Sequence, residues 1–172
     1  QYKYGSDNLE GKRVLVQGIG HVGEVLVQHL TDCGAVVTIT DINEERVNQV
    51  AAKYGATIFT GPNLYSADVD IYAPCALGAT INDASINIIK ATIIAGAANN
   101  QLANEAVHGK TLKEKGFHLV VTNDAVDWIA KTVFDPFFGA RPVKRLIQYH
   151  ALSVTVPCSG TSQLAMVSRS TC

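Results

Sequence analysis

The 172-residue sequence lacks the features that direct a protein to a membrane or to nucleic acid. No apolar run reaches the roughly 18 residues that a membrane-spanning helix needs. The polar start, QYKYGSDNLEGK, has no apolar core of the kind found in signal peptides. The 14 Lys and Arg residues and 15 Asp and Glu residues leave a net charge of −1, which attracts neither nucleic acid nor an anionic membrane. We therefore expect no nucleic-acid partner and no membrane partner.

Cysteine is also scarce. The four cysteines (Cys33, Cys75, Cys158 and Cys172) have no short paired spacing, which excludes a zinc knuckle and a CxxC redox site. The histidines show no metal-ligand spacing either, so no metal site is expected. A reduced, cytoplasmic protein is the simplest interpretation.

Apolar residues make up 47% of the chain and charged residues 17%, which predicts a folded globular protein. Short apolar runs alternate with helical patterns, and the connections between them are short. This order predicts an α/β fold, a doubly wound parallel sheet covered on both faces. The expected strands are residues 13–17, 36–40, 56–59, 70–73, 92–95 and 118–121, and the expected helices are 22–33, 44–54 and 103–115.

The character of the chain changes after residue 121. Residues 122–150 predict a short helical extension. In residues 151–172, eight of 22 residues are Ser or Thr and no helical or strand pattern persists, so we expect a weakly ordered, irregular tail. The predicted organisation is therefore a sheet domain over residues 1–121, then the extension, then the tail.

A glycine motif follows the first expected strand. Gly18, Gly20 and Gly23 fit GxGxxG, a helix follows, and Asp41 comes about 20 residues later. Gly18 permits a tight turn, Gly20 lets a pyrophosphate approach the backbone, and Gly23 allows close helix packing. Asp41 is placed to accept hydrogen bonds from ribose hydroxyls and to repel a 2′-phosphate. The pattern predicts a Rossmann domain that binds NAD in preference to NADP.

Three alternatives remain open at this point. The glycines could form a tight turn without any ligand. Asp41 could cap the helix that starts near Glu44, alone or together with a ribose contact. A methyltransferase could also use a loop of this kind.

Four ordered motifs extend the pattern: LEGKRVLVQGIGHVG, TDIN, IYAPCALGATIN and IAGAANNQL. Over roughly residues 4–116, they resemble the cofactor domain of the leucine dehydrogenase family, which includes phenylalanine, valine and glutamate dehydrogenases. The resemblance implies NAD as cofactor and oxidative deamination of a branched-chain L-amino acid to its 2-oxo acid. It also leaves a homo-oligomer open, because members of the family form oligomers.

The resemblance implies a set of cofactor-binding residues. Cys75 lies in the loop that passes beside the cofactor, although an inert buried thiol is the favoured interpretation over a redox role. Asn100 matches a family asparagine at the nicotinamide riboside, with a turn residue as the alternative. His21 is best explained as a generic loop residue. The complete predicted set is Gly18, Gly20, His21, Val22, Gly23, Asp41, Ile42, Cys75, Ala76, Leu77, Ala98 and Asn100.

Two departures from the family argue against catalysis by this chain alone. The family takes its catalytic lysine and aspartate from a substrate domain that precedes the cofactor domain, and that domain is absent here. Where the family has a segment like PDxxxNAGG, this chain reads VVTNDAVDWIAK. We therefore assign no catalytic residue, and expect an amino-acid substrate to be used only if the missing domain is supplied.

A second resemblance covers residues 118–148. FDPFFGARPVKR is similar to the C-terminal subdomain of Clp-type AAA+ disaggregases, in which an arginine matching Arg141 senses nucleotide phosphates. The chain has no GxxxxGK[ST] loop, so ATPase activity is not expected. Arg141, Lys144 and Arg145 are better explained as a solvated basic helix face.

The junction between segments that resemble two unrelated families suggests a chimera, a misassembled reading frame or a fitted sequence. Three functions are then open for this chain: the cofactor part of a dehydrogenase, an NAD-binding module without turnover, or an inactive scaffold.

Overall fold

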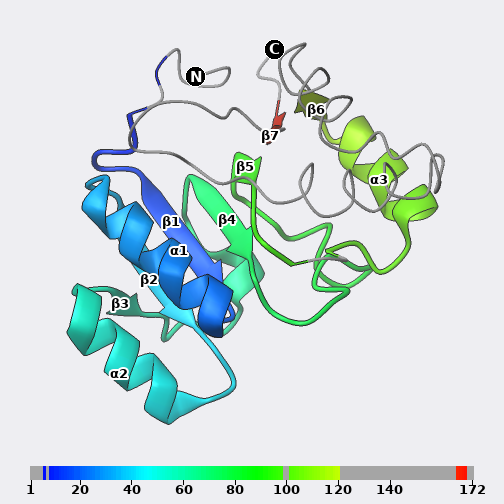
Figure 1. The fold of residues 1–172 in the computed structure, drawn as a ribbon. Helices are drawn as coiled ribbons and strands as arrows, with labels where there is room; N and C mark the ends of the chain where they lie inside the picture. Colours follow the sequence, from blue (N-terminus) through cyan, green and yellow to red (C-terminus); the bar gives the residue numbers. More distant parts are fainter. Residues whose placement is uncertain (1–5, 7, 99–100, 121–165, 170–172) are drawn as a thin grey trace, which may run out of the picture.

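The computed structural model describes residue 6 and residues 8–98, 101–120 and 166–169, the last four and residues 118–120 by their backbone (Figure 1). Asn100, the expected helical extension over 122–150 and Arg141 lie outside the described residues. The expectations that concern them therefore remain predictions.

The first half of the sheet forms as the sequence patterns indicate. Strand β1 (Arg13–Gln17) and strand β2 (Val36–Thr40) pair in parallel, with Arg13 opposite Val36 and Gln17 opposite Thr40. Helix α1 (His21–Asp32) connects them, and helix α2 (Glu44–Tyr54) leads to the short strand β3 (Thr57–Ile58). Gly55 ends α2 in the left-handed conformation, which glycine adopts readily.

The second half is built from shorter strands. After a 3-10 turn, η1 (Leu64–Ser66), come strand β4 (Ile71–Pro74) and strand β5 (Ile93–Ile94). Helix α3 (Glu105–Glu114) and strand β6 (Phe117–Val120) follow. Each element lies within one or two residues of its expected position.

The strand order is β3-β2-β1-β4-β5-β7-β6, and the first five strands are parallel. The chain winds outward from β1 to β3, then returns to β4 on the other side of β1. This confirms the doubly wound fold. It also places a topological switch point between the carboxyl ends of β1 and β4, where such sheets bind ligands.

The end of the sheet differs from the expectation. Strand β7 (Met166–Arg169) lies inside the segment expected to be irregular, and it pairs antiparallel with both β5 and β6. β5 and β6, which both belong to the expected set of strands, are thus joined through β7. The prediction failed because backbone pairing between two available strand edges requires no side-chain pattern in the segment that fills the gap.

Buried side chains form one cluster on each face of the sheet. Val14 and Val16 of β1 face one cluster, with contributions from α1 and α2, whereas Leu15 faces the other, which includes Leu112 of α3. Figure 1 shows α1 and α2 together beside β1 to β3, and α3 near the opposite end of the sheet. Both faces are covered, which explains why β1 reads as an unbroken apolar run.

The cysteines correct one expectation. Cys75 is a free thiol, but Cys33 is disulfide-bonded, so the interpretation of a fully reduced chain is wrong. Spacing along the sequence does not report which residues meet in space.

Among the described residues, no helix has the length and apolarity needed to cross a membrane.

Candidate dinucleotide-binding site

Gly18 occupies a position that excludes any side chain. Its φ of +89° is in the left-handed region, and its N–H donates to the Thr40 carbonyl over 2.8 Å. A Cβ atom here would lie 2.5 Å from the backbone nitrogen of Ala76. Gly18 therefore brings the loops after β1 and β4 into direct backbone contact, beyond the tight turn that the motif predicts.

The other two glycines of the motif have opposite surroundings. A Cβ on Gly23 would overlap the carbonyl oxygen of Gly18, so this glycine lets α1 begin directly against the loop. A Cβ on Gly20 would meet none of the described atoms within 4 Å. Gly20 is also the N-cap of α1, and no side chain of the described residues caps this helix. The unpaired N–H groups and positive dipole end of α1 are therefore open for an anion.

Asp41 holds the loop from the end of β2. One carboxylate oxygen accepts the Ile19 N–H over 2.7 Å, and the other accepts the Asn43 N–H over 3.0 Å. The helix-capping alternative for Asp41 is wrong, because Asn43 is the N-cap of α2 and accepts the Arg46 N–H. A carboxylate has about four acceptor positions, so capacity for further hydrogen bonds remains.

A charged residue that the sequence analysis did not identify, Arg46, also reaches the loop, and Glu24 holds it. Arg46 of α2 donates through Nε to the Ile19 carbonyl and through Nη2 to Glu24 over 2.9 Å. Glu24 also pairs with Lys53 over 2.9 Å. The hydrogen bond from Lys53, and to a smaller extent the charge of Arg46, hold the pKa of Glu24 below its ordinary value. Glu24 and Arg46 lie 22 residues apart and on different helices, so no helical or strand period in the sequence pairs them.

The loop after β4 completes one side of the switch point. The Cys75 N–H donates to the Gln17 carbonyl over 2.7 Å, continuing the pairing of β1 and β4. Its sulfur accepts the Ala97 N–H over 3.5 Å, and burial raises the pKa of the thiol. A largely buried, protonated thiol agrees with the interpretation of Cys75 as an unreactive packing residue.

The loop after β5 runs alongside. A Cβ on Gly96 would overlap the Pro74 carbonyl, and that carbonyl accepts the Ala98 N–H over 3.0 Å. Ala98 is buried, so its side chain packs inside the loop. Asn100, two residues further, lies outside the described residues.

Apolar side chains are exposed at this same edge. Ile42, between β2 and α2, and Leu77, in the loop after β4, are fully exposed, and Val22 in the first turn of α1 is 63% exposed. His21 is exposed beside them. Exposed apolar side chains around open N–H groups and a carboxylate suit a ligand with flat apolar rings, ribose hydroxyls and phosphates.

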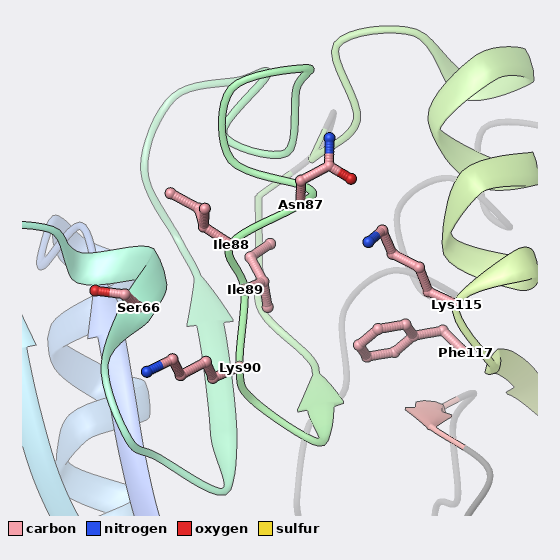
Figure 2. A pocket seen from close by; sticks show the side chains of 7 residues that line it. All are labelled: Ser66, Asn87, Ile88, Ile89, Lys90, Lys115 and Phe117. Atoms are coloured by element: carbon pink, nitrogen blue, oxygen red, sulfur yellow. The ribbon is translucent and has the colours of Figure 1, made fainter.

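A pocket of about 440 Å³ lies elsewhere (Figure 2). Ser66 of η1 lines it together with residues 87–90 before β5 and with Lys115 and Phe117 at the start of β6, so the pocket lies at the amino ends of these strands. Figure 2 shows Lys115 and Phe117 facing the segment that carries Asn87 and Lys90. It contains none of the predicted site residues. No cluster able to hold a metal occurs among the described residues.

Taken together, the strand order and the glycine loop at the switch point define a Rossmann-type fold. Among solved structures, the chain is similar to the L-tryptophan dehydrogenase of Nostoc punctiforme, with a TM-score of 0.63 and 34% identity over 86% of this chain and 45% of that one. D-lactate dehydrogenase of Escherichia coli has the same fold, with a TM-score of 0.51 and 19% identity, covering 62% of this chain and 35% of that one.

More particularly, the sequence is 50% identical to the leucine dehydrogenase of Bacillus subtilis strain 168 over 113 residues. It is 49% identical to that of Thermoactinomyces intermedius over the same length. Each match covers 66% of this chain and 31% of the relative. The chain thus contains a leucine dehydrogenase-like domain and spans about a third of the length of these relatives.

A different family matches the later part of the chain. Residues 98–154 match the C-terminal, D2-small domain of ClpB protein. The match agrees with the second resemblance seen in the sequence and extends it back to residue 98, in the loop after β5, and on to residue 154.

Proposed function

We propose that this chain binds NAD at the switch point and serves as the cofactor-binding part of an amino-acid dehydrogenase. The observation that carries the proposal is the open, uncapped start of α1 at Gly20, in a chain with leucine dehydrogenase relatives. A pyrophosphate there would meet free N–H groups and the helix dipole together.

The remaining residues fit the rest of the cofactor. Asp41 would accept the adenosine ribose hydroxyls with its remaining acceptor positions, and its charge would repel a 2′-phosphate. Ile42 and Val22 would offer apolar surface near the adenosine half. Cys75, Ala76 and Leu77, with Ala98 and Asn100, would lie along the nicotinamide half, as the family resemblance implies.

The chemistry of the whole protein is a further part of the proposal. When bound, NAD would supply the hydride acceptor for oxidation of a branched-chain L-amino acid. The residues of this chain would bind and orient the cofactor through the loops after β1, β2 and β4. A base and the amino-acid contacts must come from residues outside the described site, because productive geometry requires both. We propose a cytoplasmic location on the same family grounds, although a disulfide such as that of Cys33 is uncommon in a reducing compartment.

A second candidate is an NAD-binding module without turnover. The ClpB-type match favours it, because that match begins at residue 98, within the predicted nicotinamide side of the site. In a chimera of this kind, the pyrophosphate half would keep its function, and the nicotinamide half would not support catalysis.

Calorimetric titration with NADH, and with NADPH as the control, tests the shared proposal. Saturable NADH binding and much weaker NADPH binding are expected. A folded protein that binds neither would refute it. Turnover of leucine with NAD then separates the two candidates. An intact mass different from 18.4 kDa would indicate a misread sequence rather than a real junction between two families.

A further inference from the structure

The glycine loop is held from α2 by a charged group outside the GxGxxG motif. We infer that Arg46, kept in place by Glu24, is a positioning residue that orients the Gly20 N–H toward the cofactor. This inference rests on the proposed function and adds a determinant to it.

The argument begins with peptide planarity. The Ile19 carbonyl and the Gly20 N–H belong to one planar, trans peptide unit, so fixing the carbonyl fixes the direction of the N–H. Arg46 Nε donates to this carbonyl. The preceding peptide is fixed too, because Asp41 accepts the Ile19 N–H over 2.7 Å. Two consecutive peptide planes are thus held by opposite charges, one on each side of Ile19.

Glycine makes this restraint necessary. Gly20 has no Cβ to limit its backbone, and a Cβ there would meet none of the described atoms within 4 Å. The openness that admits a pyrophosphate therefore also removes local restraint on the backbone. A cationic donor on the carbonyl additionally polarises the peptide, which makes the Gly20 N–H a stronger donor.

Glu24 determines where the guanidinium lies. Its Oε2 accepts from Arg46 Nη2 over 2.9 Å, and its Oε1 is held by Lys53 over 2.9 Å and by the Tyr54 hydroxyl over 3.3 Å. Because Glu24 is in the first turn of α1, Arg46 is tied to the helix whose start forms the proposed anion site. The Arg46 side chain is about two-thirds buried and the Glu24 side chain about three-quarters buried. This burial limits the screening of their attraction by water and salt.

A purely structural role would join α1 to α2 and nothing more. The two roles can be separated because Lys53 also joins α2 to Glu24 but makes none of the hydrogen bonds to the loop. Arg46→Met removes the guanidinium and keeps an unbranched, helix-compatible side chain. Arg46→Lys restores a cationic donor, and Lys53→Met is the matched control.

The experiment measures NADH affinity by calorimetry, and the backbone order parameter of Gly20 by NMR relaxation without cofactor. We expect Arg46→Met to weaken NADH binding by about five- to tenfold, the net contribution of one ordinary hydrogen bond, and to lower the Gly20 order parameter. Arg46→Lys should recover part of both. Lys53→Met should change NADH affinity by less than about twofold, as expected for an exposed ion pair.

Failure of this inference differs from failure of the proposed function. If the wild-type chain binds NADH and Arg46→Met binds it equally well, the positioning role is wrong and the proposed function stands. Equal losses in Arg46→Met and Lys53→Met would also overturn it, because the effect would then be structural. If the wild-type chain binds no NADH, the proposed function fails, and an unchanged Gly20 order parameter in Arg46→Met would refute the loop restraint separately.

Discussion

The two halves of the sheet are built differently. In the first half, the five-residue strands β1 and β2 pair along their whole length, and the side chains of Asp41, after β2, and Arg46, in α2, hold the glycine loop. From β4 onward the strands shorten to two residues at β5, and the antiparallel β7 separates β5 from β6. The leucine dehydrogenase motifs continue across both halves, but the ClpB-type match begins only at residue 98.

The difference separates the two tasks of a dinucleotide site. The first half contains the parts that fit a pyrophosphate and an adenosine ribose, and each is held by at least one hydrogen bond or backbone contact. The second half would supply the nicotinamide side, where hydride transfer demands a closely defined geometry. The comparison therefore predicts that binding is more robust than catalysis in this chain.

The largest expected effect is a loss of folding stability in the first half of the sheet, at Gly18. Gly18→Ala should lower the free energy of unfolding by about 3 kcal/mol, because it adds left-handed strain and a clash with the Ala76 backbone. Urea denaturation measures this loss. Gly20→Ala is the matched control, since its Cβ faces open space; it should retain stability within about 1 kcal/mol and lose NADH affinity. Equal stabilities of the two variants would contradict the proposed geometry.

A smaller effect is expected in the second half. His108 is buried; its Nδ1 accepts the Asn104 N–H over 2.9 Å, and its Nε2 lies 3.1 Å from an Asp83 carboxylate oxygen. His108→Leu would leave the Asn104 N–H without its acceptor, which should cost about 1–3 kcal/mol in urea denaturation. The exposed His21→Leu is the control and should change stability little. No loss in His108→Leu would show that α3 is held mainly by apolar packing.

The Asp41 carboxylate tests the first half of the sheet through nucleotide affinity rather than stability. Asp41→Ala removes the acceptor of the Ile19 N–H and the charge expected to repel a 2′-phosphate. NADH affinity should fall about tenfold, which corresponds to about 1.4 kcal/mol, and the ratio of NADPH to NADH affinity should rise. Titration with both nucleotides measures this. Asp68→Asn, at the opposite edge beside Arg13, makes the same charge change and should leave the ratio unaltered.

The smallest effect concerns pH. Ion pairing with Lys53 and Arg46 lowers the pKa of Glu24. A carboxylate with a lowered folded-state pKa contributes stability above its unfolded pKa and loses that contribution as pH falls through the folded value. Stability should therefore decline below about pH 4, in the range where free glutamate titrates. Glu24→Gln should flatten this part of the profile, measured by thermal unfolding between neutral and acid pH; an unchanged slope would contradict the assignment.

Much of the first half could be predicted from residue patterns. β-branched runs with glycine at their ends gave the positions of β1 and β2, and Gly55 gave the end of α2. Asn43 could have been predicted as the N-cap of α2, since Asn before two glutamates is a typical helix start. Arg46 could not have been predicted to reach Ile19, because that contact depends on how α2 packs beside α1.

By itself, the sequence determined the order of strands and helices from β1 to β6, the glycine loop and the similarity to leucine dehydrogenase. These follow from local preferences and from motifs that are contiguous in the chain. Only the tertiary structure decided that Asp41 and Arg46 fix the two peptides around Ile19, that Gly18 abuts Ala76, and that β7 separates β5 from β6. These contacts join residues far apart in the chain, and their geometry is set by sheet pairing and helix packing rather than by any periodic pattern.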